Sequence, residues 1–285
     1  MFGSIGTRMA TSPILSFHDG HTIPQLGYGV WQVEDDVAER VVGQALAAGY
    51  RHIDTAAIYG NEAGVGRALA DSDVDRDDVF VTTKLWNTDQ GYDSTLRAFD
   101  ASMAKLGIDA LDLYLIHWAM PAKGRFLDTW KAFIELQKQG RIRSIGVSNF
   151  PEAQLTELIE ASGVTPVIHQ IELSPYLTQE RLRAVDAEHE ILTQAWSPLG
   201  SGKGLLDDPT LARIATKHGA TPGQVVLAWH LALGNVVIPK SVTPSRIVEN
   251  FAALDVTLDD EDIAAISGLN KDERTGPDPA TFDVE

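Results

Sequence analysis

The 285-residue sequence contains no cysteine, which excludes disulfides, thiolate metal ligands and a cysteine nucleophile. It also lacks an apolar run of the roughly 20 residues that a transmembrane helix needs. The first residues, MFGSIGTRMATSP, lack the basic-then-apolar order of a secretory signal, so we expect residues 1–12 to form a flexible tail. These absences favour a cytoplasmic protein without membrane contact.

Basic residues are scarce: 23 Lys and Arg face 40 Asp and Glu, which gives a net charge of −17. Nucleic acids bind through clustered cations that neutralise phosphates, so this balance argues against a nucleic-acid partner. One loop is an exception, because it holds Lys240 and Arg246 and has no acidic residue from Lys240 to Val248. We interpret this loop as a local anion site.

Short runs rich in Val, Ile and Leu alternate with helical periods such as Val37–Ala48 and Thr95–Leu106. Residues 14–24 precede this alternation and predict a β-hairpin around a His-Asp-Gly turn. The strands are expected at residues 26–29, 51–54, 79–85, 111–117, 142–147, 167–172, 191–196 and 236–239. Eight such strand–helix units are typical of an α/β fold of the (β/α)₈ or TIM barrel type.

An open, doubly wound sheet in two domains is the alternative architecture. We prefer a single barrel domain over residues 1–285, because no Pro/Gly/Ser-rich linker divides the chain and polar residues follow strand ends along its whole length. In a barrel those ends converge on one pocket. The polar, Pro-rich segment 271–285 is expected to be a short C-terminal tail that leaves the mouth of the barrel open.

Four residues at predicted strand ends suit proton transfer: Asp54, Tyr59, Lys84 and His117. A phenol has a pKa of about 10, so Tyr59 needs help to donate a proton near neutrality. The Lys84 ammonium would lower that pKa, Asp54 would hold Lys84, and His117 would orient a substrate oxygen. Taken singly, each residue has an ordinary structural explanation as a packing, turn, solvated or core side chain. Their joint position favours protonation of an oxygen that gains charge as a carbon is reduced.

Several long motifs occur in a fixed order: GYRHIDTAAIYGNEAGVGRAL, VFVTTKLW, LDLYLIHW, GRIRSIGVSNF and VVIPKSVTPSRIVEN. Together they resemble the motifs of the aldo-keto reductases from about Phe17 to Asn250, and most of all the prokaryotic members of the 2,5-diketo-D-gluconate reductase type. The resemblance implies an NAD(P)H-dependent (β/α)₈ barrel in which Asp54, Tyr59, Lys84 and His117 are the catalytic residues.

No GxGxxG motif follows a strand and opens a helix, so a Rossmann-type nucleotide site is not supported. The loop with Lys240, Ser241, Val242 and Thr243 offers an ammonium and hydroxyls instead. Arg246 at the opening of the next helix could clamp a 2′-phosphate, and Glu249 and Asn250 could meet the adenine. In the resembled family these positions bind the adenosine phosphate. We therefore expect NADPH as cofactor, with NADH weaker; a basic surface loop that merely balances an acidic protein is the alternative.

The nicotinamide half of the cofactor is assigned to later strand ends. Ser148, Asn149 and Gln170 carry the groups that a carboxamide needs, and by resemblance they hold it. Trp196 looks like the aromatic residue that stacks on the nicotinamide, although core packing would also explain it. Ser197 and Leu199 resemble the loop along the pyrophosphate, which Gly202 and Gly204 would leave mobile.

Aromatic residues after strand ends predict the walls of a substrate pocket. They are Tyr28, Trp31, Trp86 and Trp118. The sequence thus predicts a monomeric NADPH-dependent reductase of small aldehydes and ketones. Two alternatives are a non-catalytic NADPH-binding sensor and a metal-dependent barrel hydrolase or isomerase. The second would need clustered metal ligands, and only His117 and His169 lie near strand ends, so no metal site is expected.

Overall fold

The computed structural model describes residues 11–285, so the first ten residues of the predicted N-terminal tail lie outside the described part. Ser12, which also belongs to that predicted tail, is tied to the fold, because its hydroxyl accepts a hydrogen bond from the Leu26 N–H at 2.9 Å. Residues 14–24 form the predicted hairpin. Strand β1 (Ile14–Ser16) pairs antiparallel with β2 (Thr22–Pro24).

Within residues 11–285, eight strands form a parallel sheet in which each strand pairs with the next in the chain. Leu26 bridges to Val237 of the last strand; the Gly27 N–H donates to the Val237 carbonyl (2.8 Å), and this closes the sheet into a barrel. The predicted (β/α)₈ barrel is confirmed. The strands are β3 (Tyr28–Gly29), β4 (His52–Asp54), β5 (Phe80–Leu85), β6 (Leu111–Ile116), β7 (Ile142–Ser148), β8 (Ile168–Glu172), β9 (Leu192–Trp196) and β10 (Val236–Val237).

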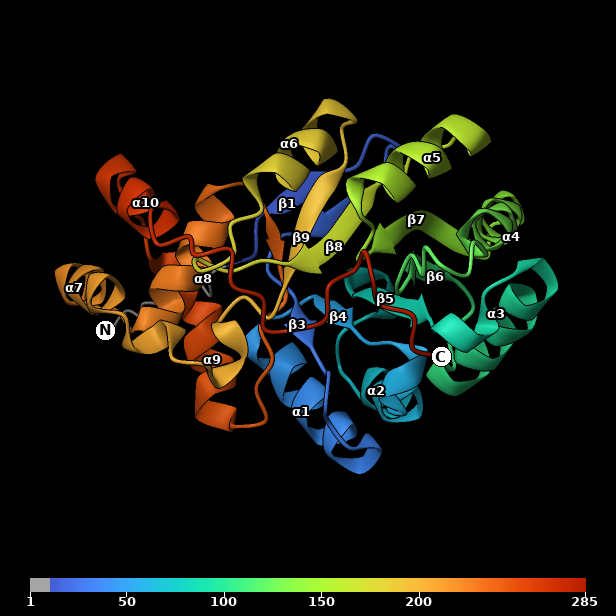
Figure 1. Ribbon diagram of the computed structural model, residues 1–285. Helices are drawn as coiled ribbons and strands as arrows, with labels where there is room; N and C mark the ends of the chain where they lie inside the picture. The colour runs from blue at the N-terminus through green and yellow to red at the C-terminus, as the bar shows by residue number, and fades with distance from the viewer. Residues whose placement is uncertain (1–10) are drawn as a thin grey trace.

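Helices surround the strands on the outside of the barrel (Figure 1). They are α1 (Asp35–Ala48), α2 (Glu62–Ala70), α3 (Tyr92–Leu106), α4 (Phe126–Lys138), α5 (Glu152–Ser162), α6 (Glu180–Glu188), α7 (Pro209–His218), α8 (Pro222–Ala232), α9 (Pro244–Phe251) and α10 (Asp260–Ser267). A short 3₁₀ turn, η1 (Ala57–Tyr59), follows β4. None of the helices in the described residues combines the length and the apolar character needed to cross a membrane.

Glycines follow the ends of several helices. Gly49, Gly107 and Gly163 follow α1, α3 and α5 with φ values of 110°, 64° and 68°, a left-handed conformation that glycine adopts without a steric penalty. Helix α8 begins instead with a capping box, in which Thr221 and Gln224 each bond the backbone N–H of the other. These signals set the lengths of the units around the barrel.

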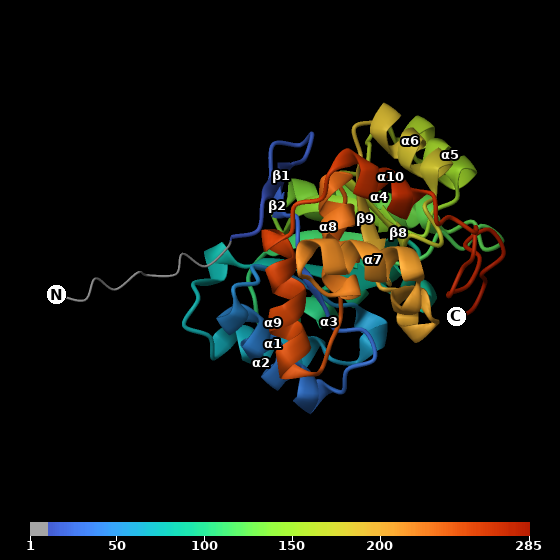
Figure 2. The same ribbon diagram turned by 90° about the vertical axis from the view of Figure 1, so that its left-hand side faces the viewer.

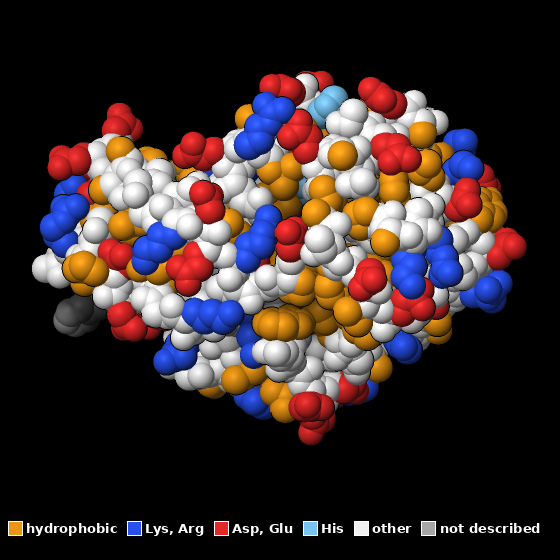
Figure 3. Space-filling model, viewed as in Figure 1, with side chains coloured by type: hydrophobic (Ala, Val, Ile, Leu, Met, Phe, Trp, Pro, Cys, Tyr) orange, Lys and Arg blue, Asp and Glu red, His pale blue; other side chains and the backbone are white. Residues whose placement is uncertain are grey.

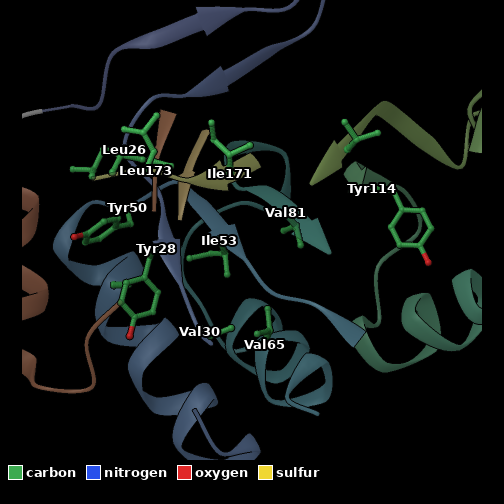
Figure 4. Close-up of a cluster of buried hydrophobic side chains, with 14 of the residues drawn as sticks. Leu26, Tyr28, Val30, Tyr50, Ile53, Val65, Val81, Tyr114, Ile171 and Leu173 are labelled. Carbon is green, nitrogen blue, oxygen red and sulfur yellow. The ribbon is translucent and has the colours of Figure 1, made fainter. Parts of the chain in front are cut away.

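Side chains on the outer face of the strands pack against the helices and form the main hydrophobic core. Figure 4 shows members of this cluster, among them Ile53, Val81 and Ile171 from three strands and Val65 from α2. A second, smaller cluster fills one end of the barrel. There Phe17 and Ile23 of the hairpin pack against inward-facing residues such as Leu113 and Val236. The hairpin therefore plugs the amino-terminal end of the barrel.

The C-terminal segment crosses the opposite end of the barrel. Figure 2 shows the hairpin and this segment on opposite sides of the molecule. The ring of Phe282 lies 4.2 Å from that of Trp118, and the Val284 carbonyl accepts a hydrogen bond from Asn87 (2.8 Å). The expectation that the tail leaves the mouth open was therefore wrong. Its polar composition concealed one aromatic side chain and several backbone groups that bind the rim.

Candidate active site

A buried lysine lies at the centre of the four predicted proton-transfer residues. Lys84 near the end of β5 is 0% exposed, and its ammonium donates to Asp54 Oδ1 (2.5 Å) at the end of β4 and to the Thr55 carbonyl (2.8 Å). The hydroxyl of Tyr59, from η1, lies 3.5 Å from Lys84 Nζ. His117, directly after β6, packs edge-on against Tyr59 with 5.8 Å between ring centroids. The structure thus brings all four side chains together.

Asp54 is held on both carboxylate oxygens. Lys84 occupies Oδ1, and the side-chain amide of Gln170 donates to Oδ2 at 2.8 Å. The sequence assigned Gln170 to a cofactor carboxamide, but here its Nε2 fixes the orientation of Asp54. Thr55 adds a second support, since its hydroxyl donates to Asn61 Oδ1 (2.7 Å), and Asn61 in turn binds the carbonyls of Val30 and Val33. No motif predicted this network.

The ionisation of the group differs from the expectation in one respect. Burial raises the pKa of Tyr59 above its ordinary value, and the nearby Lys84 ammonium only partly opposes this. Lys84 does act to lower the phenol pKa, as predicted, but burial outweighs it, so the net shift is upward. Burial also lowers the pKa of Lys84, but the charge of Asp54 outweighs it, so the pKa lies above the usual value and the ammonium stays charged.

His117 is neutral. Burial, followed by repulsion from the Lys84 charge, holds the pKa of His117 well below its ordinary range. Its Nδ1 has no hydrogen-bond partner in the described residues. A neutral imidazole can donate one N–H to a carbonyl oxygen without placing a second positive charge beside Lys84.

The predicted nicotinamide residues form a connected group at the ends of β7, β8 and β9. Asn149, in a left-handed conformation (φ 54°), donates from Nδ2 to the His117 carbonyl (3.0 Å), and its Oδ1 accepts from Trp196 Nε1 (2.9 Å). Ser148 is buried, and its hydroxyl donates to the Gln170 carbonyl (3.0 Å). Trp196, Ser197 and Leu199 remain partly exposed at the rim. The arrangement ties Trp196 to the backbone beside His117.

The predicted phosphate loop leaves its cations free for a ligand. Lys240 and Arg246 are exposed, and within residues 11–285 neither makes an ion pair. Arg246 is the third residue of α9, whose N-terminal N–H groups favour an anion. Thr243 and Val242 are exposed beside them, whereas Ser241 is buried and accepts the Thr243 N–H (3.1 Å).

The two residues expected to contact an adenine, Glu249 and Asn250, differ in their burial and in the hydrogen bonds that they already make. Asn250 is buried, and Glu249 already accepts a hydrogen bond from the Thr221 hydroxyl at the start of α8 (3.0 Å). Glu249 therefore also links α9 to α8. An adenine contact through its carboxylate would have to share this bond.

Two of the four predicted pocket aromatics lie against His117 of the proton-transfer group. Trp86 and Trp118 flank His117 with ring centroids 5.3 Å and 6.5 Å away, and Trp31 is 48% exposed. Figure 3 shows hydrophobic side chains gathered around a hollow near the middle of this face. Together they provide apolar walls around a polar floor, as small-molecule sites do.

Tyr28 lies apart from this group. Its ring is buried in the core against Tyr50, as Figure 4 shows, and its hydroxyl donates to the Ser241 carbonyl. Tyr28 therefore supports the Ser241 backbone from within the core and does not line the mouth.

The comparisons with known proteins agree with this geometry. The model of the aldo/keto reductase family matches residues 25–271. The chain belongs to the aldo/keto reductase family. This membership makes the protein an oxidoreductase. No group of three or more potential metal ligands occurs among residues 11–285.

Individual relatives match this aldo/keto reductase over nearly its whole length. An aldo-keto reductase of Mycolicibacterium smegmatis is 57% identical over 95% of this chain and 98% of its own. Methylglyoxal reductase DkgA of Escherichia coli is 49% identical over 96% and 99%. Among solved structures, a mutant of Gox0644 in complex with NADPH has a TM-score of 0.92 and 49% identity, covering 96% of this chain and 99% of that one.

Proposed function

We propose that this aldo/keto reductase is an NADPH-dependent reductase of small aldehydes and ketones, in which Tyr59 is the general acid. The observation that carries the proposal is the packing of the Tyr59 ring against the neutral His117, with 5.8 Å between ring centroids, while the buried Lys84–Asp54 pair lies beside the Tyr59 hydroxyl. The NADPH-bound relative supports the choice of cofactor.

The residues at the rim suit an anionic dinucleotide. Lys240 and Arg246 offer unpaired cations for a 2′-phosphate, and the Ser197–Gly204 segment follows β9 towards the same side. Trp196 offers a partly exposed aromatic face, and Ser148 and Asn149 offer polar groups beside it. Bound there, NADPH would supply the hydride for the carbonyl carbon.

The protein side of the reaction is proton delivery. The Tyr59 hydroxyl and one N–H of His117 hold the carbonyl oxygen, and Tyr59 gives its proton as negative charge develops there. Because burial keeps Tyr59 protonated, the acid form is available at neutral pH. The Lys84 ammonium stabilises the phenolate that remains, and Asp54 and Gln170 keep Lys84 in place.

The aromatic walls favour compact carbonyl compounds. Trp86, Trp118 and Phe282 narrow the space beside His117. A substrate such as methylglyoxal, which names one relative, would fit this description. We expect no cationic substrate, because Lys84 would repel it.

The experiment is NADPH consumption by the purified protein with methylglyoxal, an aromatic aldehyde, a β-keto ester and a diketo sugar acid, with NADH in parallel. Turnover with NADPH on at least one carbonyl supports the proposal. NADPH binding without turnover on any of them would favour a cofactor-sensing protein instead.

Tyr59→Phe separates acid catalysis from binding. Removal of the hydroxyl should lower kcat by about 10²- to 10⁴-fold, the usual contribution of a general acid, while the Kd for NADPH stays within about twofold. Phe keeps the ring that packs against His117, so the fold should be unchanged. Unchanged kcat would remove Tyr59 from the mechanism.

A further inference from the structure

A buried carboxylate at the mouth binds only the tail. Glu172 ends β8 and is 3% exposed, and among residues 11–285 it forms no ion pair. Its Oε1 accepts the N–H and the hydroxyl of Thr275, both at 2.5 Å, and its Oε2 accepts the Gly276 N–H at 3.0 Å. A buried charge is costly unless its oxygens are hydrogen-bonded, so these three bonds hold Thr275 and Gly276 at one place.

Thr275 extends the contact to the segment after β9. Its carbonyl accepts a hydrogen bond from Lys203 Nζ (3.1 Å), and its hydroxyl lies 3.4 Å from that of Ser201. Ser201 in turn donates to the Ser197 hydroxyl (2.9 Å). The tail thus contacts Ser201 and Lys203 of the Ser197–Gly204 segment, which the sequence predicts to be mobile.

Gly276 lies against the ring of Trp196. A Cβ at this position would be 2.6 Å from Cη2 of Trp196, closer than real Cβ contacts come, so only glycine allows the approach. Glu172 and Trp196 are also direct neighbours in the pairing of β8 with β9. The indole is therefore fixed at two edges: Asn149 holds its Nε1, and Gly276 bounds the opposite six-membered ring.

We propose that Glu172 and Thr275 are positioning residues of the cofactor site. They fasten the tail across the rim and thereby fix Trp196 and the Ser197–Gly204 segment, which sets how firmly the cofactor is held. This inference rests on the proposed NADPH site, but it assigns a role to a strand-end carboxylate and to the tail that the proton-transfer chemistry does not use. The tail would then affect how firmly the cofactor is bound, in addition to covering part of the substrate pocket.

The test compares Thr275→Val, which removes the hydroxyl but keeps the shape, with Thr275→Ser, which restores it. Thr281→Val is the matched control, because Thr281 lies in the same tail with an exposed side chain. Glu172→Gln is a second variant, which weakens the same hydrogen bonds to Thr275 and Gly276 by removing the charge of the acceptor. Stopped-flow fluorescence gives the release rate and Kd of NADPH, and steady-state kinetics with saturating NADPH give kcat/KM for methylglyoxal or the best carbonyl of the panel.

We expect Thr275→Val and Glu172→Gln each to raise the release rate and the Kd by about tenfold, the effect of one lost hydrogen bond to a charged group. Thr275→Ser and Thr281→Val should stay within about twofold of the unmodified protein, and kcat/KM for the carbonyl should change far less than the Kd in all variants. Thr275→Val alone decides the question if Glu172→Gln does not fold.

Release rates equal to those of the control would overturn the positioning role and leave the reductase proposal intact. A uniform loss of kcat/KM without faster release would also overturn it, because it would indicate general disorder of the site. Failure of the unmodified protein to bind NADPH would instead overturn the proposed function itself and this inference with it.

Discussion

At the scale of single residues, the site depends on a buried ammonium surrounded by oxygen atoms. Lys84 would be costly to bury alone, and Asp54 and the Thr55 carbonyl offset that cost while leaving the third direction open towards Tyr59. Burial keeps His117 neutral, and repulsion from the Lys84 charge adds to this effect. Burial also keeps Tyr59 protonated, so both neighbours of Lys84 are uncharged.

Arg246→Ala tests the assignment of the phosphate loop. Loss of the guanidinium should raise the Kd for NADPH by about 10- to 100-fold, since a hydrogen-bonded charge pair contributes about 1.5–3 kcal/mol. The Kd for NADH should stay nearly unchanged. Titration of both cofactors by fluorescence measures this. Arg213→Ala is the control, because Arg213 is also exposed and lies on another helix, α7. Equal weakening of NADPH and NADH would contradict a 2′-phosphate contact.

The sequence predicted the residues at strand ends better than the direction of each side chain. Asp54, Lys84 and His117 could be placed because parallel strands present their carboxyl ends at one rim. Tyr28 could not, because a barrel strand is buried on both faces and has no polar alternation to show which side chains point inward. The pairing of Gln170 with Asp54 could not be predicted, because it joins β8 to β4, two strands far apart in the chain.

At the scale of elements, close helix packing depends on particular glycines. Helix α2 approaches the end of α3 so closely that a Cβ on Gly66 would lie 2.5 Å from the Leu106 carbonyl oxygen. Gly43 of α1, in contrast, has nothing within 4 Å of its hypothetical Cβ. Both are helical glycines, so they form a matched pair.

We expect Gly66→Ala to destabilise the fold by about 1–3 kcal/mol through overpacking, even though alanine favours helices. Gly43→Ala should instead stabilise it by up to about 1 kcal/mol, because only the helix propensity changes there. Denaturant unfolding of the two variants measures the difference. Equal effects of the two substitutions would contradict the close approach of α2 to α3.

The junction of α7 and α10 should respond to acid. Asp262 is buried, which raises its pKa, but hydrogen bonds from His218 (2.6 Å) and Lys217 (2.9 Å) outweigh this and leave the pKa below the ordinary 3.8. A lowered carboxyl pKa stabilises the folded state above the unfolded pKa, and the contribution is lost as pH falls through the folded value.

Asp262→Asn should therefore cost about 1–2 kcal/mol at pH 7, a modest value because Lys217 is partly exposed to solvent. The cost should shrink as the pH falls below about 4, where the aspartate is protonated as well. Urea unfolding of both proteins at several pH values measures the difference. A cost that is independent of pH would indicate that shape, not charge, matters at this position.

At the scale of the whole molecule, the hairpin of β1 and β2 and the C-terminal segment lie at opposite ends of the barrel (Figure 2). The sequence predicted the barrel and the hairpin, because each has a local pattern. It did not predict where the tail lies, because its contacts join residues about a hundred or more positions apart, such as Thr275 with Glu172 and Val284 with Asn87. Long-range contacts of this kind leave no local periodicity to read.

Deletion of residues 282–285 tests whether the end of the tail forms a wall of the substrate pocket. The change removes Phe282 from Trp118 and the Val284 contact with Asn87. We expect kcat/KM for a bulky aromatic aldehyde to rise by about tenfold relative to methylglyoxal, as a wall of the pocket is lost. Stability should fall by about 1 kcal/mol or less, because the deleted ion pairs are exposed. An unchanged ratio would show that these residues do not bound the pocket.

The hairpin that plugs the barrel determines from which end a ligand can reach the site. Phe17 and Ile23 close the amino-terminal end of the barrel. A ligand can therefore enter and leave only at the carboxyl-terminal end. It reaches the proton-transfer group only from the rim that the tail crosses, so one end of the barrel serves stability and the other serves chemistry.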